Sequence, residues 1–305
     1  ELLWCAALLH DVEKRTTTVI ESDGRITSHG HARKGELSAR EILFKEIELA
    51  FEQREHIAAL VRYHGLPLWI LEKTDPVKSL LEAAGRLNVQ LLYLLAKADI
   101  LGRICADQQE MLERVEFFKA FCMEQNCWDS PKEFTNGHAR FYYFNTESAA
   151  VDYVPFNDLK CEVLLMSALP GMGKDHYIKK HYPTYPVISL DEIRRKHKIS
   201  PTDKAANGWV VQEAKEQARI YLRQSQSFVW NATNITRQMR SQLIELFSTY
   251  KAKVKIIYIE APYEKWVKQN KNRDFALPQQ VIDKMLKKLE VPQLYEAHEV
   301  EYIIG

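Results

Sequence analysis

Cysteine is scarce in this sequence, and long apolar runs are missing. The 305 residues include five cysteines, an odd number without a C-x-x-C pair, which is typical of reduced thiols in a cytosolic protein rather than of a disulfide framework. No apolar run is long enough to span a bilayer, and no signal-peptide pattern is found. Repeats and low-complexity tracts are missing as well. We therefore expect a cytoplasmic protein without a membrane partner, long enough for two domains with their own cores.

Net charge is also small, but it is unevenly distributed. The formal charge is +1, yet residues 1–150 carry 18 Lys/Arg and 23 Asp/Glu, whereas residues 151–305 carry 24 and 18. A basic second half suits a polyanionic substrate. Ordinary solvated helix faces give the same count, so the charge alone does not choose between the two.

Residues 1–130 have the pattern of a helical domain. Apolar residues recur at helical spacing, and convincing strands are absent. Because residues 2–9 already resemble the middle of a helix, we expect further sequence upstream of Glu1. In segment 131–158 the pattern changes to prolines and an aromatic run, which predicts a connector with one strand packed against the second domain. The expected helices are 1–10, 36–52, 54–64, 76–87, 88–104 and 107–125.

From residue 159 to 305 strands and helices alternate. This order predicts a parallel sheet covered by helices, with ligands at the carboxyl ends of the strands. The expected fold class is thus an all-α domain followed by an α/β domain with a parallel sheet. The expected strands are 161–167, 186–190, 227–231, 253–260 and 300–304. The expected helices are 175–182, one that opens at Asp191, 209–226, 236–250, 262–272 and 278–289.

The second half is organised around residues 161–175, C-E-V-L-L-M-S-A-L-P-G-M-G-K-D. An apolar strand enters a Gly/Pro turn that leads into a helix, which is the context of a P-loop. Backbone N–H groups of such a loop hold phosphate oxygens, and its lysine neutralises the β and γ phosphates. A tight turn before an amphipathic helix is the plainer alternative. The predicted residues for ATP or another NTP are Pro170, Gly171, Met172, Gly173, Lys174 and Asp175.

Two positions depart from the usual P-loop pattern. Ala168 replaces the first glycine, and Asp175 replaces the Ser/Thr that binds the metal. The charge of Asp175 would repel the nucleotide phosphates unless a cation lies between them. We therefore predict that Asp175 meets Mg²⁺ directly or through its water; the alternative is that it only caps the helix.

Three further residues of the second half suit phosphoryl transfer. Asp191 follows an apolar strand, so it lies at the sheet edge where the P-loop opens and can accept a proton from a hydroxyl. Arg194 shares its helical face and can hold an anionic substrate group. Arg273 ends a basic stretch and can stabilise the transferring phosphoryl group. The alternatives are a helix N-cap with a solvated arginine for the first two, and a C-terminal arginine facing the helix dipole for the third.

These residues resemble the kinase module of polynucleotide kinases over roughly residues 160–300. The similarity is carried by L-P-G-M-G-K, strand-D-E-I-R, N-A-T-N and K-Q-N-K-N-R before a proline. It implies that Asp191 is the general base toward a 5′-OH, that Arg194 contacts a substrate phosphate, and that Arg273 is the lid arginine. Gln269 stands where a second lid arginine is expected, which puts part of the nucleotide grip in doubt.

The first half contains an adjacent His10-Asp11 pair at the end of an apolar helix, suited to a hydrolytic divalent-metal site. Further His and Asp residues follow in S-H-G-H, V-R-Y-H and A-K-A-D. Such residues at the ends of apolar helices are costly unless they are ligated or paired. A helical docking domain with a few satisfied histidines is the alternative.

The order His-Asp, His, His, Asp is similar to the HD superfamily of metal-dependent phosphohydrolases over about residues 1–105. The resemblance implies one metal at His10, Asp11 and Asp99, a second at His31 and His64, and Lys14 facing the phosphate. His29 competes with His31, which is preferred for its glycine neighbour, and His56 is expected to be structural. The family has a further His ligand upstream of the pair, outside this chain.

An HD phosphohydrolase followed by a polynucleotide-kinase module resembles the bacterial HD-Pnk family of RNA end-healing enzymes. The resemblance implies hydrolysis of 2′,3′-cyclic or 2′ phosphates with divalent, transition-type metal ions. It also implies transfer of an NTP γ-phosphate to a 5′-OH with Mg²⁺, and an RNA ligase acting downstream. RNA or DNA could supply the ends. The alternatives are a small-molecule kinase fused to an HD nucleotidase, and an ATP-driven switch with a nucleotide-binding HD domain.

Overall fold

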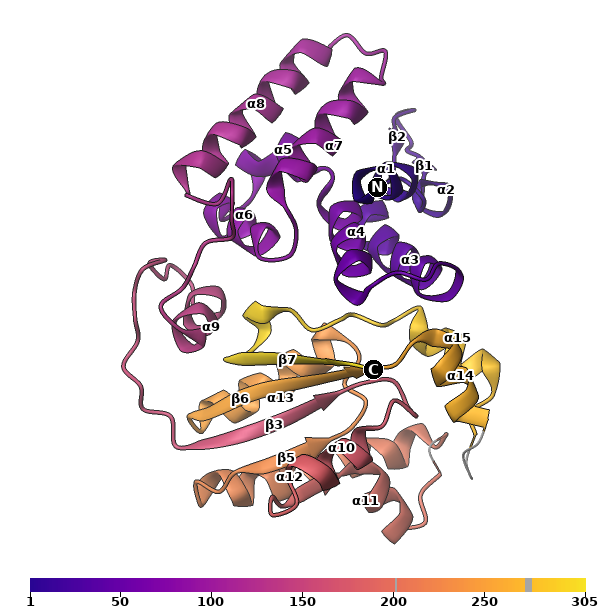
Figure 1. Ribbon diagram of the computed structural model, residues 1–305, viewed down its shortest axis with the longest axis vertical. Coiled ribbons are helices and arrows are strands. Elements are labelled where there is room, and N and C mark those ends of the chain that lie inside the picture. Colours follow the sequence, from indigo (N-terminus) through magenta and orange to yellow (C-terminus); the bar gives the residue numbers. More distant parts are fainter. Residues whose placement is uncertain (201, 272–275) are drawn as a thin grey trace. The chain divides into compact units, whose positions relative to one another are not determined.

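The computed structural model describes residues 1–200, 202–271 and 276–305. The chain divides into two compact units, Glu1–Glu133 and Phe134–Gly305 (Figure 1). The first is helical, and the second is an α/β unit with a five-stranded parallel sheet. The expected fold class is therefore confirmed.

The first unit consists of helices around an apolar core. It also contains one hairpin, in which the two-residue strands β1 (Val19–Ile20) and β2 (Ile26–Thr27) pair antiparallel. Its core residues include Leu43, Leu60 and Leu92, which are fully buried or nearly so. Its helices are α1 (Leu2–Leu9), α2 (Lys14–Thr17), α3 (His31–Glu46), α4 (Phe51–Tyr63), α5 (Leu66–Trp69), η1 (Ile70–Glu72), α6 (Pro76–Ala84), α7 (Val89–Leu101) and α8 (Gln108–Glu124).

Helices α3 and α4 pack closely, and Gly35 allows it. A Cβ at this position would lie 3.1 Å from Val61 Cγ1, closer than ordinary van der Waals contact. Helix α3 begins at His31, five residues earlier than expected, because Gly30 adopts a left-handed conformation (φ 77°) that starts the helix there. The sequence patterns did not predict α2, α5, η1 or the hairpin.

Segment 131–158 does not contain the expected strand. It instead contains helix α9 (Gly137–Asn145), whose N-cap is Asn136, with its side chain accepting a hydrogen bond from Ala139 N at 2.8 Å. The helix packs against the C-terminal part of its own unit. Arg140 Nε donates to Leu294 O at 3.0 Å, and the ring centroids of Phe144 and Tyr295 lie 5.3 Å apart. The aromatic run therefore forms a helix face, because this local cap and these contacts outweigh its β-propensity.

The sheet of the second unit has the order β4-β5-β3-β6-β7, and all neighbours are parallel. Its strands are β3 (Cys161–Ser167), β4 (Val187–Ser189), β5 (Phe228–Asn231), β6 (Ala252–Glu260) and β7 (Glu299–Ile304). Its helices after α9 are α10 (Lys174–His181), α11 (Leu190–Lys196), α12 (Lys204–Arg223), α13 (Arg237–Thr249), α14 (Tyr263–Lys271), α15 (Gln279–Leu286) and η2 (Leu294–Glu296).

The central strand β3 is buried from Val163 onward, as a parallel sheet covered by helices requires. Val163 and Leu165 face a core that also contains Val210 of α12 and Phe247 of α13. The loops after β3, β4 and β5 consequently open at one edge of the sheet. Helix α12 begins five residues earlier than expected because the Asp203 side chain accepts from Ala206 N at 3.0 Å.

No helix within the described residues is long and apolar enough to cross a membrane.

Candidate active sites in the two units

The predicted metal ligands of the first unit come from four different helices. His10 follows α1, His31 is the first residue of α3, His64 follows α4, and Asp99 lies in the last turn of α7. Asp11 follows His10 directly. Helix ends allow short side chains to converge, and the structure brings all five together.

Each histidine ring is oriented by a backbone carbonyl of the preceding turn. The Nδ1 atoms of His10, His31 and His64 lie 2.7, 2.7 and 2.8 Å from carbonyl oxygens three residues earlier in the chain. A carbonyl only accepts, so each Nδ1 carries the proton and each Nε2 of a neutral ring presents a lone pair. Nδ1–H donation to a backbone carbonyl is the usual support for a metal-binding imidazole.

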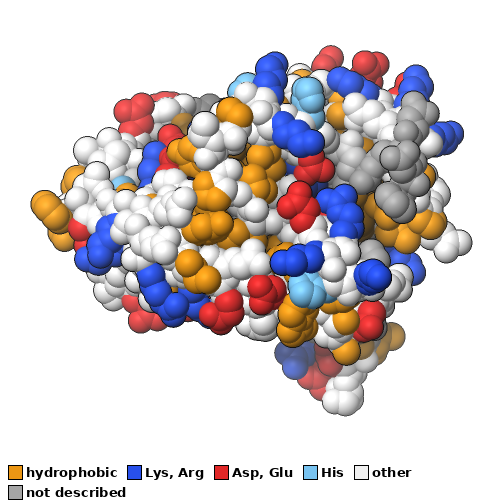
Figure 2. All heavy atoms as spheres, turned by 90° about the horizontal axis from the view of Figure 1, so that it is seen from below, with side chains coloured by type: hydrophobic (Ala, Val, Ile, Leu, Met, Phe, Trp, Pro, Cys, Tyr) orange, Lys and Arg blue, Asp and Glu red, His pale blue; other side chains and the backbone are white. Residues whose placement is uncertain are grey.

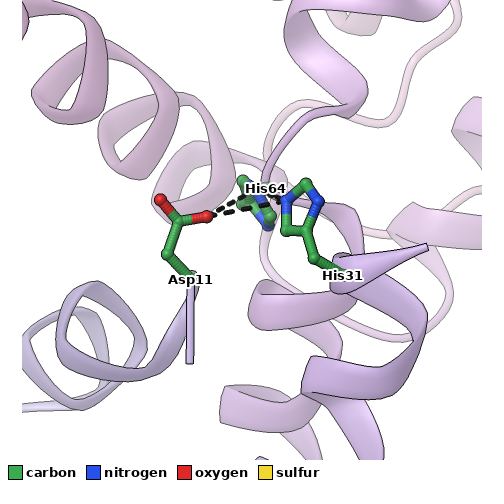
Figure 3. A group of neighbouring side chains, drawn as sticks. All are labelled: Asp11, His31 and His64. Atoms are coloured by element: carbon green, nitrogen blue, oxygen red, sulfur yellow. Dashed lines mark hydrogen bonds and ion pairs between the residues drawn. The ribbon is translucent and has the colours of Figure 1, made fainter. Parts of the chain in front are cut away.

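The rings of His31 and His64 face Asp11 (Figure 3), and His10 Nε2 also lies near this carboxylate. Asp11 Oδ1 lies 3.5 Å from His31 Nε2 and 3.8 Å from His64 Nε2. Its other oxygen, Oδ2, lies 3.2 Å from His10 Nε2, which is itself 3.7 Å from Asp99 Oδ1. Asp11 thus lies between the two ligand sets that the resemblance separates, and it forms one cluster with His31 and His64 whose ligand atoms all lie within 4.8 Å.

The donor set fits a divalent metal. His31 Nε2 and His64 Nε2 are only 3.2 Å apart, and two lone pairs at that distance repel unless a cation or a proton lies between them. Among the side chains of the described residues, His10 Nε2 and Asp11 Oδ1 are buried without a hydrogen-bond partner. Imidazole and carboxylate together suit transition metals.

The charges of the cluster shift its pKa values in opposite directions. The nearby carboxylates, first that of Asp11 and then that of Asp99, stabilise the protonated ring of His10 and raise its pKa to about 10. Burial lowers the pKa of His64 to about 4. Although burial opposes it, the neighbouring His10 and Arg103 lower the pKa of Asp99. The cluster therefore favours a positively charged ring at His10 and a neutral ring at His64.

Cations line the cavity that opens onto this cluster. Lys14 Nζ lies 2.7 Å from Asp11 Oδ2, and Arg103 pairs with Asp99. The cavity, of about 560 Å³, is also lined by Arg62, Lys73 and the half-exposed Trp69. Its volume is in the range of small-ligand sites, about 300–1,000 Å³, and its cations suit a phosphate.

The other histidines lie outside the cluster. His29 is exposed, and His56 Nε2 accepts a hydrogen bond from Asn88 N at 3.1 Å, which ties α4 to the start of α7.

The P-loop of the second unit follows β3, as predicted. Gly171 and Gly173 have φ angles of 85° and 92°, which only glycine adopts readily and which turn the backbone N–H groups inward. The loop is supported from two sides: Ala168 N donates to Thr233 O at 3.0 Å, and Trp266 Nε1 donates to Pro170 O at 2.8 Å. This loop is suited to hold an anion.

Lys174 begins α10, and its Nζ lies 3.3 Å from Ala168 O within the loop. The next residue, Asp175, accepts a hydrogen bond from Asn231 Nδ2 at 2.7 Å. Asn231 is the last residue of β5. This contact holds one carboxylate oxygen of Asp175 at the carboxyl edge of the sheet, near the predicted phosphate site.

Asp191 lies in the first turn of α11, after β4. Its Oδ1 lies 2.6 Å from Arg194 Nη1, and the side chain is 81% exposed, whereas that of Arg194 is 21% exposed. Arg194 Nε also donates to Asn207 Oδ1 at 2.6 Å. The arginine is thus held between two helices, and the carboxylate faces solvent where a substrate can approach. The predicted lid residue, Arg273, lies outside the described residues.

Three supporting residues were not among the predicted site residues. Asn231 stands in the N-A-T-N motif, which had no assigned role, and Arg103 lies four positions after the predicted ligand Asp99. Trp266 carried no local signal, because its partner Pro170 lies far away in the chain.

Comparisons with known proteins match both units. Residues 1–104 match the family model of the HD domain, and residues 163–292 match that of an AAA domain. No curated protein matches the chain.

Several solved structures match part of the chain. A kinase-like protein from Chloroflexus aurantiacus has 12% identity and a TM-score of 0.40 over 48% of this chain and 86% of its own. A sugar kinase from Janibacter sp. has 14% identity and a TM-score of 0.34 over 48% and 84%. A gluconokinase from Sinorhizobium meliloti has 16% identity and a TM-score of 0.32 over 48% and 82%. At these scores the likenesses say nothing about this chain's substrate.

The chain therefore carries an HD domain in its first half and a P-loop kinase-like domain in its second half.

Proposed function

We propose that this protein is a bifunctional RNA end-healing enzyme of the HD-Pnk type. The HD domain removes a 2′,3′-cyclic or 2′ phosphate, and the P-loop domain transfers the γ-phosphate of an NTP to a 5′-OH. One observation supports it most: a single chain combines a His/Asp cluster beside a cationic cavity with a P-loop that shares a sheet edge with an exposed aspartate. A broken RNA with a cyclic phosphate and a 5′-OH needs both reactions before an RNA ligase can join the ends.

In the HD domain, His10, Asp11, His31, His64 and Asp99 would hold the divalent ion or ions, which supply Lewis acidity and lower the pKa of bound water. Lys14 and Arg103 lie beside the carboxylates Asp11 and Asp99 and face the cavity. Their role is to position the phosphate of the ester and to balance the charge that develops on its oxygens. Hydrolysis breaks one P–O ester bond, and water supplies the hydroxyl and the proton.

In the kinase domain, the P-loop N–H groups and Lys174 bind the NTP phosphates. Asp191 takes the proton of the 5′-OH, and the 5′-oxygen forms the new bond to the γ-phosphorus of the NTP. The bond between that phosphorus and the oxygen that bridges it to the β-phosphate breaks, and the NDP leaves. Arg194 binds a phosphate of the acceptor strand. Its contacts to Asp191 and Asn207 orient the guanidinium in advance of binding.

The test is incubation with a 5′-OH, 2′,3′-cyclic phosphate oligoribonucleotide, NTP, Mg²⁺ and Mn²⁺, with both ends resolved in the products. We expect 5′-phosphate and loss of the cyclic phosphate. Parallel reactions use the matching DNA, free nucleosides and gluconate as acceptors. Transfer to a nucleoside or to gluconate alone would overturn the polynucleotide assignment and favour a small-molecule kinase. NTP binding without transfer to any acceptor would favour a switch.

A further inference from the structure

A pair of aromatic rings lies on the surface of the second unit beside the predicted catalytic helix. His197, which follows α11, and Trp209, in α12, have ring centroids 4.7 Å apart at an interplanar angle of 70°. Trp209 is 46% exposed, and His197 is exposed as well. A large aromatic ring left open to solvent on a helix whose other face fills the core, as Val210 does, is a surface available for stacking.

Basic residues flank His197 along the chain. The segment from Arg194 to Ser200 reads R-R-K-H-K-I-S, with four basic residues and no acidic one. Arg195, Lys196 and Lys198 are all exposed. The view from below shows Lys and Arg side chains (blue) interspersed with Asp and Glu side chains (red) and a few histidines (pale blue) (Figure 2). Aromatic rings among basic side chains match single-stranded nucleic acid, in which bases stack and phosphates pair with cations.

The pair is fixed relative to Asp191. The Asn207 side chain accepts from Arg194 Nε at 2.6 Å and donates to Ser200 O at 3.1 Å, which joins α11, the loop after it and α12 two residues before Trp209. Ile199 N also donates to Arg194 O at 2.9 Å, which closes the end of α11. The rings and the catalytic carboxylate therefore belong to one rigid corner of the unit.

The distance suits a strand rather than a single nucleoside. His197 lies six residues after Asp191 along α11, roughly 9 Å at the helical rise. A stacked strand advances about 3.4 Å per nucleotide. The first nucleotide, whose 5′-OH reacts at Asp191, thus ends short of the rings, whereas the third or fourth nucleotide of a strand, two to three steps further on, reaches them.

We propose that His197 and Trp209, with Arg195, Lys196 and Lys198, form the subsite that binds the third and fourth nucleotides of a single-stranded acceptor. This inference rests on the proposed kinase function and specifies how it selects a polynucleotide over a nucleoside. The bases stack on the Trp209 ring, and the basic residues contact the phosphates between them.

The first test compares acceptor lengths. The wild type, Trp209→Ala and Trp209→Phe are assayed with a 5′-OH decanucleotide and with a nucleoside 3′-monophosphate. Because one base stack contributes about 1–3 kcal/mol, Trp209→Ala should raise the KM for the decanucleotide by about 5- to 150-fold. The kcat and the KM for ATP should stay unchanged, as should the KM for the mononucleotide, and Trp209→Phe should restore most of the loss. Trp4→Ala, which removes an 81% exposed tryptophan of the first unit, is the matched control.

The second test measures binding without transfer. The affinity for a 3′-fluorescein decanucleotide is followed by anisotropy from 50 to 300 mM salt. Lys196→Ala and Lys198→Ala should each reduce the salt slope by about 0.7, the value for one phosphate contact on a single strand. Lys287→Ala, at an exposed lysine at the end of α15, should leave it unchanged.

The outcomes separate the subsite from the function. If the wild type phosphorylates the decanucleotide and Trp209→Ala has the same KM for it, the subsite is overturned but the proposed kinase function is not. An equal loss for the mononucleotide also overturns it, because the ring would then act at the reaction centre or on folding. A wild type that phosphorylates only nucleosides overturns the polynucleotide function itself, and with it the subsite.

Discussion

Asp175 is the residue at which this P-loop differs most from the usual pattern. A carboxylate beside bound phosphates is unfavourable unless a cation separates them, and the contact to Asn231 Nδ2 at 2.7 Å stabilises it on one oxygen only. The other oxygen is therefore available to Mg²⁺ or to its water. Asp175 also lies in the first turn of α10, where a carboxylate faces the positive end of the helix dipole without any metal, so the Mg²⁺ role stays a prediction.

We predict that Asp175→Ala raises the Mg²⁺ concentration required for half-maximal transfer and lowers the rate. Asp175→Ser should keep substantial activity, because a hydroxyl is a neutral ligand for the ion. Asn231→Ala should shift the Mg²⁺ titration less, in the same direction, because it only loosens the carboxylate. The neighbouring exposed residue gives the control, His176→Ala. Equal titration curves for the wild type and Asp175→Ala would mean that the ion never meets this residue.

At Asp191 the prediction concerns proton transfer. Asp191→Asn keeps the shape of the side chain and removes the base, so ATP binding should persist while transfer to the 5′-OH falls by about 10²–10⁴-fold. Single-turnover rates and ATP affinity measure the two separately. Glu192→Gln, at the adjacent exposed carboxylate, should be close to wild type, whereas Lys174→Ala should weaken both binding and transfer. A near-normal rate in Asp191→Asn would reduce this aspartate to a partner of Arg194.

At the scale of elements, a buried charge network joins α3, α4 and the end of α6 in the first unit. Arg40, whose side chain is 2% exposed, contacts Glu36 and Glu55 at 2.9 Å each, and Arg86 also pairs with Glu36. Burial opposes ionisation of Glu36, but the charges of Arg86 and Arg40 outweigh it and lower its pKa to about 2. Removing one partner from such a network destabilises the fold strongly because it leaves a buried charge without compensation, whereas replacing the whole network by apolar residues is often neutral.

The sign of the pH dependence follows from this shift. The pKa of Glu36 is lower in the folded state, so its contribution to stability is complete above the unfolded value of about 4.5 and is lost as the pH falls toward 2. The shift corresponds to a contribution of about 3 kcal/mol. We predict that the melting temperature of the HD unit, followed by scanning calorimetry, falls steeply between pH 4.5 and 2.5.

Glu36→Gln should destabilise this unit at pH 7 by about 3–5 kcal/mol, because it leaves buried arginines short of a partner. It should also flatten the acid transition. The matched control is Glu124→Gln, at an exposed residue of α8. An acid transition of the same steepness in Glu36→Gln would place the acid sensitivity elsewhere.

At the scale of the whole molecule, the two candidate sites lie in separate compact units. All five predicted ligands of the HD-type metal site fall within residues 1–133, and the P-loop, Asp175 and Asp191 fall within residues 134–305. Each unit has its own core, so a change in the chemistry of one does not require a change in the other.

We predict that the activities are separable in the intact two-unit chain. His10→Ala and Asp11→Ala should abolish the 2′,3′-phosphoesterase while the 5′-kinase rate changes little. Chelation should also abolish the phosphoesterase, and a transition metal should restore it, because imidazole ligands suit those ions. Kinase rates of both variants and of Lys14→Ala are measured beside circular dichroism spectra. Equal loss of both activities with an unchanged spectrum would indicate a composite site.

Sequence patterns predicted most of the second unit because its signals are local. Strand 161–167 was predicted at the residues where β3 lies, since a buried parallel strand is a continuous apolar run bounded by a turn. The glycines of the P-loop were identifiable because only glycine adopts their backbone angles readily. Helix α9 was missed because the local propensity of its aromatic run favours a strand, and the contacts to Tyr295 and Leu294 that help to outweigh it involve residues about 150 positions away.

The sequence by itself determined the two-part organisation, the parallel sheet and the identity of the candidate residues, because periodicity, glycine placement and motif order are properties of neighbouring residues. Only the tertiary structure decided how those residues meet. It placed Asp11 between both sets of histidines, turned His31 Nε2 and His64 Nε2 toward each other, and joined Asp175 to Asn231. Such contacts are set by the packing of helices and strands far apart in the chain, and no local pattern encodes a distance between them.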